Sequence, residues 1–242
     1  MKERYFETLP LEKNELELRE VYKGNSGIWD SGMSFEEFMM KVESGELRET
    51  ELSQNHKKKT KNNRGKTNDT VDVISNENEI SVMMHERYSY PVFHNHSYIE
   101  IFYVCSGRCR HFTDNNVSEL KKGDFVIMNP DTMHALSVTD DETVVLNILA
   151  SENVFGRSFI DMLKGDYLLV GFFEQILKRE SSYSYMMFPT GNDKWMQDTA
   201  GLLVKEIQDK AYAYESAIAL YVKQMFLHSF RLQPAVIMTW RW

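Results

Sequence analysis

The sequence predicts a mainly β protein with an α-helical part: an antiparallel β-barrel of the jelly-roll type, followed by a helical subdomain. Between residues 70 and 150, short runs of branched and aromatic residues alternate with turn signals such as Asp114-Asn115-Asn116. After Ala150 the apolar residues recur at helical spacing. At 242 residues with 42% hydrophobic side chains, the chain is long enough to bury a core.

Composition narrows the classes of function. The formal net charge is −8 and the sequence pI is about 5.4, so the chain as a whole should be repelled by phosphate backbones. The first residues lack an apolar core of signal-peptide length, and no uninterrupted apolar run is long enough to cross a bilayer. A cytoplasmic protein without direct DNA contact and without membrane contact is therefore expected.

Residues 1–69 are expected to form an N-terminal extension with one short helix and a basic loop. Ser34 followed by Glu37 is a capping-box pattern, and the apolar spacing after it predicts a helix from about 35 to 48. The one dense basic run lies at 56–66. Because it has no interleaved aromatic residues, a solvated loop is favoured over a phosphate-binding arm.

Residues 70–150 are expected to form the barrel. Short strands at regular spacing are typical of a closed antiparallel barrel, whose inward residues can line a pocket. The expected strands are 70–74, 80–87, 98–105, 108–113, 117–121, 124–129, 134–138 and 143–149.

Residues 151–232 are expected to form the helical subdomain, with a tail at 233–242. Asn192-Asp193 should cap a long helix, and a last helix should run from about Ser216 to Leu232. An extended piece is expected from Tyr183 to Phe188. The apolar faces of these helices could cover the barrel of the same chain or pair with a second copy. The sequence leaves both arrangements open.

The candidate site is carried by His94, His96 and Glu100, which lead into an apolar strand. Alternate side chains of a strand share a face, so two imidazoles and one carboxylate should point to one side. His134 follows a turn, a buried strand and a second turn, and could complete a metal-type set. Tyr98 and Phe102 share the parity of the three residues and should supply an apolar wall.

These residues resemble the cupin family of β-barrels. The first cupin motif, His-x-His-x3-Glu-x6-Gly, is matched without a gap by His94, His96, Glu100 and Gly107. The second motif is looser: Gly123, Asp124, Pro130 and His134 fit it, but Asp131 stands where a glycine is usual.

The order of parts resembles the N-terminal sensor and dimerisation region of AraC-type transcription regulators. The resemblance covers roughly residues 80 to 232 and is carried by three stretches, 98–107, 120–130 and 145–149. It implies a small-molecule effector, a homodimer, and a DNA-binding helix-turn-helix domain. Only ten residues follow the last expected helix, so DNA contact would come from a missing domain or a partner.

Three functions remain open from the sequence. The first is ligand sensing, with His94, His96, Tyr98, Glu100, Phe102 and His134 as ligand-binding residues and no turnover. The second is a metal-dependent cupin enzyme, in which His94, His96, Glu100 and His134 hold Mn, Fe, Ni or Zn. The third is an oligomerisation module or an inhibitor that acts through the helical half.

The remaining histidines and the two cysteines are expected to be structural. No sequence partner is evident for His56, His85, His111 or His228. Cys105 and Cys109 could face one another across a hairpin, but buried inert thiols fit a reducing compartment better.

Overall fold

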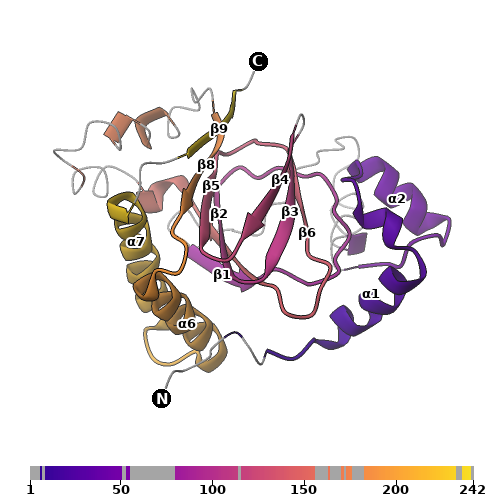
Figure 1. Ribbon diagram of the computed structural model, residues 1–242, viewed down its shortest axis with the longest axis horizontal. Helices are drawn as coiled ribbons and strands as arrows, with labels where there is room; N and C mark the ends of the chain where they lie inside the picture. Colours follow the sequence, from indigo (N-terminus) through magenta and orange to yellow (C-terminus); the bar gives the residue numbers. More distant parts are fainter. Residues whose placement is uncertain are drawn as a thin grey trace.

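A computed structural model describes residues 6, 9–50, 53–54, 80–113, 116–155, 163, 170–171, 173–175, 183–232 and 236–240. Two antiparallel sheets face one another and form a cupin-type barrel, with one layer of helices on each side (Figure 1). The expected class, a jelly-roll barrel followed by helices, is confirmed. No helix in the described ranges is both long enough and apolar enough to cross a membrane.

The larger sheet has six strands in the order β1-β7-β2-β5-β8-β9. Their bounds are β1 Ile80–Met84, β7 Val144–Ala150, β2 Ile99–Ser106, β5 Asp124–Met128, β8 Tyr183–Pro189 and β9 Val236–Trp240. The smaller sheet has the order β4-β3-β6. Its strands are β4 Asn116–Lys121, β3 Arg108–Thr113 and β6 His134–Ser137.

The expected strands from 80 onwards are found within a few residues of their predicted bounds, and the extended piece before Phe188 is β8. The expected strand at 70–74 and the basic run at 56–66 lie outside the described residues. Strand β9 was not expected in the C-terminal tail, and it pairs antiparallel with β8.

Strand parity separates two faces of the larger sheet. On β2, Phe102 and Val104 belong to the apolar cluster inside the barrel, together with Val126, Leu136 and Tyr185 of other strands. The alternate residues of β2 join a second cluster on the outer face, formed with the C-terminal helices. Since nearly every residue of β2 is buried, the strand reads as a continuous apolar run in the sequence.

The outer face of the six-stranded sheet is covered by α6 (Lys194–Asp209) and α7 (Tyr214–Leu232), as Figure 1 shows. Asp193 caps α6, as expected, because its carboxylate accepts from the Met196 N–H. The buried residues of both helices belong to the cluster that also contains Ile101 and Phe125. Of the two arrangements left open by the sequence, covering of the chain's own barrel accounts for these faces.

The N-terminal helices form a second layer on the other side of the barrel (Figure 1). They are α1 (Lys13–Gly24), the 3-10 helix η1 (Ser26–Trp29) and α2 (Phe35–Glu43); Ser34 caps α2 as expected. Their core is aromatic and includes Tyr88 and Tyr90 of the segment after β1. Trp29 is fully buried, and its ring N–H donates to the carbonyls of Tyr88 and Ser89. The layer is therefore held against residues 85–93, which lead directly into the candidate site.

A buried ion pair also fixes this layer. Arg87 donates from Nε to Glu15 Oε1 at 3.0 Å and from Nη2 to Glu15 Oε2 at 2.7 Å, so the pair is bidentate. The remaining guanidinium donors reach the carbonyls of Leu9, Pro10 and Asp141. Both residues are 6% exposed, so a full set of partners offsets the cost of removing the charges from water.

Two glycines of the cupin motifs are required by close approach. Gly107 has φ +69° at the β2–β3 turn, and a Cβ there would collide with Thr143. Gly123 has φ +89°, and a Cβ there would collide with the backbone of Gly191. Any L-residue at either position would meet both backbone strain and a steric clash.

The two cysteines do not face one another. Cys105 belongs to the cluster outside the barrel, whereas Cys109 belongs to the cluster inside it. Both are free and buried, which confirms the expectation of structural thiols. Burial raises the pKa of Cys109 to about 12 and raises that of Cys105 further, so neither thiol is poised to react. They do not face one another across a hairpin because β2 and β3 belong to different sheets.

Candidate metal-type site in the barrel

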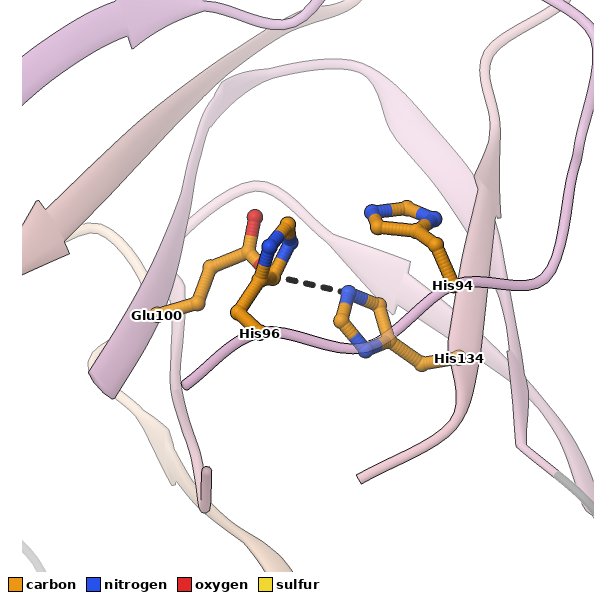
Figure 2. A group of neighbouring side chains, drawn as sticks. All are labelled: His94, His96, Glu100 and His134. Atoms are coloured by element: carbon orange, nitrogen blue, oxygen red, sulfur yellow. Dashed lines mark ion pairs between the residues drawn. The ribbon is translucent and has the colours of Figure 1, made fainter. Parts of the chain in front are cut away.

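Four residues from three parts of the chain meet inside the barrel: His94, His96, Glu100 and His134 (Figure 2). Glu100 lies at the start of β2 and His134 at the start of β6. The backbones of His94 and His134 form an antiparallel bridge, with N–H to O distances of 3.0 Å in both directions. The Asp131 N–H donates to the carbonyl of His96 at 2.7 Å. Backbone hydrogen bonds therefore fix the positions of the main-chain segments that carry the three imidazoles.

The donor atoms of the four side chains lie within 4.8 Å of one another. His134 Nε2 is 2.8 Å from Glu100 Oε2, and His96 Nε2 is 3.1 Å from the same oxygen. The ring centroids of His94 lie 4.7 Å from those of both His96 and His134. The sequence expectation that these four residues converge agrees with this geometry.

Backbone carbonyls orient two of the imidazoles. His94 Nδ1 lies 2.8 Å from the Val92 carbonyl, and His134 Nδ1 lies 2.9 Å from the Thr132 carbonyl. A carbonyl can only accept, so each Nδ1 carries a proton and donates it. The Nε2 atom of each neutral ring is then left with its lone pair. This arrangement is the one by which proteins orient histidine ligands of metal ions.

The contact between His134 and Glu100 brings a ring nitrogen close to a carboxyl oxygen. A neutral His134 would turn the lone pair of Nε2 towards a carboxylate oxygen at 2.8 Å, which is repulsive. Either a second ring proton or a metal cation removes this repulsion. Neither His134 Nε2 nor Glu100 Oε2 has a partner aligned as a hydrogen bond in the described part of the chain. The two atoms are close enough to act as ligands of one metal ion.

The electrostatics of the site follow from burial and proximity. Burial opposes ionisation of Glu100, but the imidazoles of His96 and His134 outweigh it and hold the pKa of Glu100 well below its usual range. Burial, reinforced by the neighbouring imidazoles of His134 and His96, lowers the pKa of His94 to about 3. A carboxylate beside a neutral imidazole is the protonation state that binds a divalent cation.

Metal-ligand geometry provides a test of fit. Ligand atoms about 2.1 Å from a metal are about 3 Å apart in cis positions and about 4 Å apart in trans positions of an octahedron. The 2.8 and 3.1 Å contacts and the 4.8 Å limit are compatible with such a set after small adjustments. Three nitrogens and one oxygen suit Mn, Fe, Ni or Zn. The residues therefore fit a divalent transition metal.

Tyr98 and Phe102 both contact the set. The Tyr98 ring stacks on His96, with centroids 4.6 Å apart and planes inclined by 16°. The Phe102 ring packs edge-on against His134 at 5.6 Å. Tyr98 and Phe102 are 5% and 0% exposed, so they form an apolar wall for the polar group, as their parity indicates.

His111, which was expected to be structural, is buried inside the barrel next to the site. It occupies β3, and its ring centroid is 6.0 Å from that of His134 and 5.7 Å from that of Phe102. Its sequence neighbours show no motif, and only the pairing of β3 with β6 brings it close. Two other histidines have local partners: His228 lies 3.0 Å from Asp193, and His85 lies 3.3 Å from Ser89. His56 lies outside the described residues.

A groove of about 1390 Å³ opens beside β1. One wall is the N-terminal segment from Leu9 to Glu15, and the opposite wall is the end of α6 with the start of α7. Asn147 of β7 also lines the groove, and it pairs in register with Phe102. Phe102 and the four converging residues are not among the residues that line this groove, so the groove is a separate feature from the candidate site.

Solved structures with a related arrangement are distant in sequence. An apo variant of ToxT from Vibrio cholerae is 15% identical, with a TM-score of 0.46; the match covers 65% of this chain and 57% of that one. ToxT bound to (E)-4-(8-methylnaphthalen-1-yl)but-3-enoic acid is 12% identical, with a TM-score of 0.39 and coverage of 64% and 57%. KdgF from Halomonas is 17% identical, with a TM-score of 0.28 and coverage of 33% and 76%. This chain thus spans little more than half of the ToxT chains it matches.

A search of curated proteins gives no match to the chain. A family model does match: residues 82–158 fit the model of the AraC-like ligand binding domain. The matched segment begins in β1, contains the four converging residues, and ends just after η2 (Glu152–Phe155). Residues 82–158 of this chain are therefore similar to the AraC-like ligand binding domain.

Proposed function

We propose that the chain is the ligand-sensing part of an AraC-type transcription regulator and that it binds a small molecule inside the cupin barrel. The observation that carries the proposal is the convergence of His94, His96, Glu100 and His134 in a buried position within the matched domain. Buried polar groups that converge beside an apolar wall are typical of small-molecule sites. Tyr98 and Phe102 would form that wall.

The fold offers a direct route from the site to the helices. Strand β2 presents Glu100 and Phe102 to the barrel interior, whereas Ile101 and Tyr103 of the same strand pack in the cluster that contains α6 and α7. A ligand that shifts β2 by a fraction of an ångström would therefore change how these helices pack. Two packings with different ligand affinity are all that a sensor needs.

A divalent metal would be held by His94, His96, Glu100 and His134. It would supply a Lewis-acidic centre that binds an oxygen atom of the ligand. The protein itself would contribute the neutral imidazoles, the orienting carbonyls of Val92 and Thr132, and the exclusion of water by Phe102.

We further propose a cytoplasmic homodimer that pairs through α6 and α7. Trp195, Leu202 and Leu220 remain 37%, 36% and 62% exposed on these helices after they have covered the barrel. Exposed apolar side chains on adjacent helices support a protein interface. With a net charge of −8, DNA contact is expected to come from another domain or a partner protein.

Thermal shift with a small-molecule panel would test the sensor function. A bound ligand at 100 times its Kd stabilises the fold by about 2.7 kcal/mol, which raises the melting temperature by several degrees. The Glu100→Gln variant keeps the size of the side chain but loses the charge, so its response should be reduced or absent. An equal response in the parent and in Glu100→Gln would contradict binding at this site.

The second candidate is a metal-dependent enzyme. The His/His/Glu/His set favours it, because the same donors serve catalytic metals that keep an open coordination position. The two functions differ in what happens to the bound molecule. Mass spectrometry of a bound compound after long incubation with the metal-loaded protein would recover it unchanged from a sensor and converted from an enzyme.

A further inference from the structure

Strand β1 forms one edge of the six-stranded sheet and borders the groove beside it. In the described part of the chain, β1 pairs with β7 alone. All five residues of β1, from Ile80 to Met84, line the groove. Successive residues of a strand point to opposite faces, so a space that touches all of them runs along the hydrogen-bonding edge of the strand. The groove is therefore open to the backbone of β1.

The register of the β1–β7 pair identifies the backbone groups on this edge. His85 directly follows β1, and its N–H donates to the carbonyl of Val145 at 2.8 Å. In an antiparallel pair, residues alternate between bonding to the partner strand and pointing away from it. Counting back from His85, the N–H and C=O groups of Ile80, Val82 and Met84 therefore point away from β7 and into the groove. Within the described ranges, no other segment bonds to these groups.

The composition of β1 leaves this edge open to pairing. Natural edge strands are usually blocked by charged side chains, by proline or by a bulge, because an open edge pairs with other chains. Strand β4, at the edge of the smaller sheet, carries the charges of Glu119 and Lys121. Strand β1 has the sequence Ile-Ser-Val-Met-Met, with no charge and no proline, and its register with β7 is continuous. Strand β1 is therefore suited to accept a further strand.

The groove offers apolar contacts to one face of an added strand. Ile80, Val82 and Met84 pack in or against the cluster outside the barrel. Leu9 of the N-terminal wall and Ile207 near the end of α6 also line the groove, and both pack against the same cluster. Every second side chain of an added strand would meet this region, because residues two apart share a face. Apolar side chains are therefore expected at these positions of the strand.

The charges around the groove select the remaining side chains of the strand. The Arg87–Glu15 ion pair lines the groove and contributes no net charge. The other charged groups of the lining are three carboxylates and one ammonium group: Glu12, Glu86, Glu215 and Lys210. These four groups give a net charge of −2, which attracts basic side chains and repels acidic ones.

We propose that the edge of β1 is a docking site for an extended segment of another protein, in which apolar side chains alternate with lysine or arginine. The segment would add to β1 as a further strand and bond to the backbone of Ile80, Val82 and Met84. In this mode of recognition, main-chain hydrogen bonds give affinity and the alternate side chains give specificity. The groove is separate from the candidate metal-type site, so the inference adds a protein partner that the sensor function does not require.

Fluorescence anisotropy of a labelled peptide gives the first test. The probe is the amidated peptide Lys-Val-Arg-Val-Lys-Val, titrated with the full chain. In the control peptide, glutamate replaces each basic residue. The basic peptide should bind at least about tenfold more tightly than the acidic one, and the difference should shrink at high salt. A third peptide, with the basic sequence but N-methylated throughout its backbone, should not bind, because it cannot donate hydrogen bonds to β1.

A substitution within β1 places the binding site. Val82→Pro removes an N–H that points into the groove, and an edge strand tolerates proline, so the pairing with β7 should persist. Val82→Ala is the matched control, because it also shortens the side chain but keeps the N–H. The basic peptide should bind Val82→Pro at least about fivefold more weakly than Val82→Ala, since one hydrogen bond is lost. Circular dichroism checks that both variants fold.

A charge reversal tests the same groove without changing β1. Glu215→Lys alters an exposed residue at the start of α7 and makes the lining less acidic. The affinity for the basic peptide should fall at least about threefold. Glu119→Lys is the matched control, because it makes the same change on β4, outside the groove.

Several outcomes would overturn the inference. Equal affinity for the basic and acidic peptides removes the charge argument, and equal binding by Val82→Pro and Val82→Ala removes β1 as the site. No binding of the basic peptide at a protein concentration of about 1 mM means that the edge does not accept such a segment. Self-association of the chain that is lost in Val82→Pro, measured by sedimentation, would assign the edge to a second copy instead. None of these results bears on the small-molecule response that tests the sensor function.

Discussion

Two groups of buried charged residues in this protein are built in opposite ways. The Arg87–Glu15 pair is satisfied in every direction, by a bidentate ion pair and by carbonyls of Leu9, Pro10 and Asp141. The His94, His96, Glu100 and His134 set also brings polar atoms within 3 Å or so of one another, but His134 Nε2 and Glu100 Oε2 lack hydrogen-bond alignment. The saturated network holds the fold, whereas the converging unsaturated set is the one that we propose binds a ligand.

Breaking the saturated network should have the largest effect. Arg87→Leu leaves Glu15 buried without its partner, and removing one member of a buried pair costs about 3–5 kcal/mol of unfolding free energy. Urea unfolding followed by circular dichroism would measure the loss. The double variant Glu15→Leu/Arg87→Leu removes both charges and should recover part of it. No recovery would mean that the backbone contacts of Arg87, and not its charge, hold the N-terminal layer.

Breaking the unsaturated set should change metal binding more than stability. Glu100→Gln should weaken zinc binding by at least about 100-fold, because it replaces an anionic ligand by a neutral amide. Its unfolding free energy without metal should fall, because the favourable charge interaction of Glu100 with His96 and His134 is lost, but by less than in Arg87→Leu, because the buried amide carries no unpaired charge. Elemental analysis and urea unfolding check the two parts. Equal zinc content in both proteins would remove the metal hypothesis.

A smaller effect is expected when the Arg87–Glu15 pair is tested by lowering the pH, because the unfolding free energy then depends on the charge of Glu15. Hydrogen bonds and charge from Arg87 outweigh burial and lower the pKa of Glu15 below its ordinary value of 4.5. A depressed folded-state pKa gives stability that is present above pH 4.5 and is lost as the pH falls through the folded-state value. Unfolding free energies measured from pH 6 downwards should therefore fall less steeply below pH 4.5 in Glu15→Gln than in the parent. Parallel curves would contradict a stabilising carboxylate at Glu15.

The smallest effect is expected at Asp131, which changes the backbone of the site without changing its donor atoms. Asp131 has φ +63°, in the left-handed region, and this explains why a glycine is usual at this position of the motif. Asp131→Gly relieves the backbone strain in the folded state but increases the conformational entropy of the unfolded chain. The two effects oppose one another, so the unfolding free energy should change by less than about 1 kcal/mol. Zinc affinity should stay within threefold of the parent. A larger loss of affinity would show that the aspartate side chain, beyond its backbone N–H on His96, orders the site.

Several parts of this structure were predictable because they depend on local periodicity. The spacing of His94, His96 and Glu100 around the start of a strand predicts a shared face, and the turn before His134 predicts a second strand that could reach them. The caps Ser34 and Asp193 were predictable for the same reason, since a side chain three residues from its backbone partner needs no tertiary context.

Other parts depended on which strand lies beside which. His111 looked structural because no neighbour in sequence marks it, and only the β3–β6 pairing places it beside His134. Cys105 and Cys109 looked like neighbours, but their strands belong to different sheets, and the two side chains lie in different apolar clusters. The Arg87–Glu15 pair joins residues 72 positions apart, so no local sequence pattern predicts it.

The sequence by itself determined the barrel, the helices after it and the four converging residues. Strands and helices follow from apolar residues that recur every two or every 3.6 positions, and alternation along a strand places His94, His96 and Glu100 on one face. Tertiary structure alone decided that α6 and α7 cover the barrel's own sheet and that His111 and Asn147 face its interior. It also decided that the N-terminal helices hold the segment leading to His94. Contacts between distant segments depend on register and packing, and these are settled only when the whole chain folds.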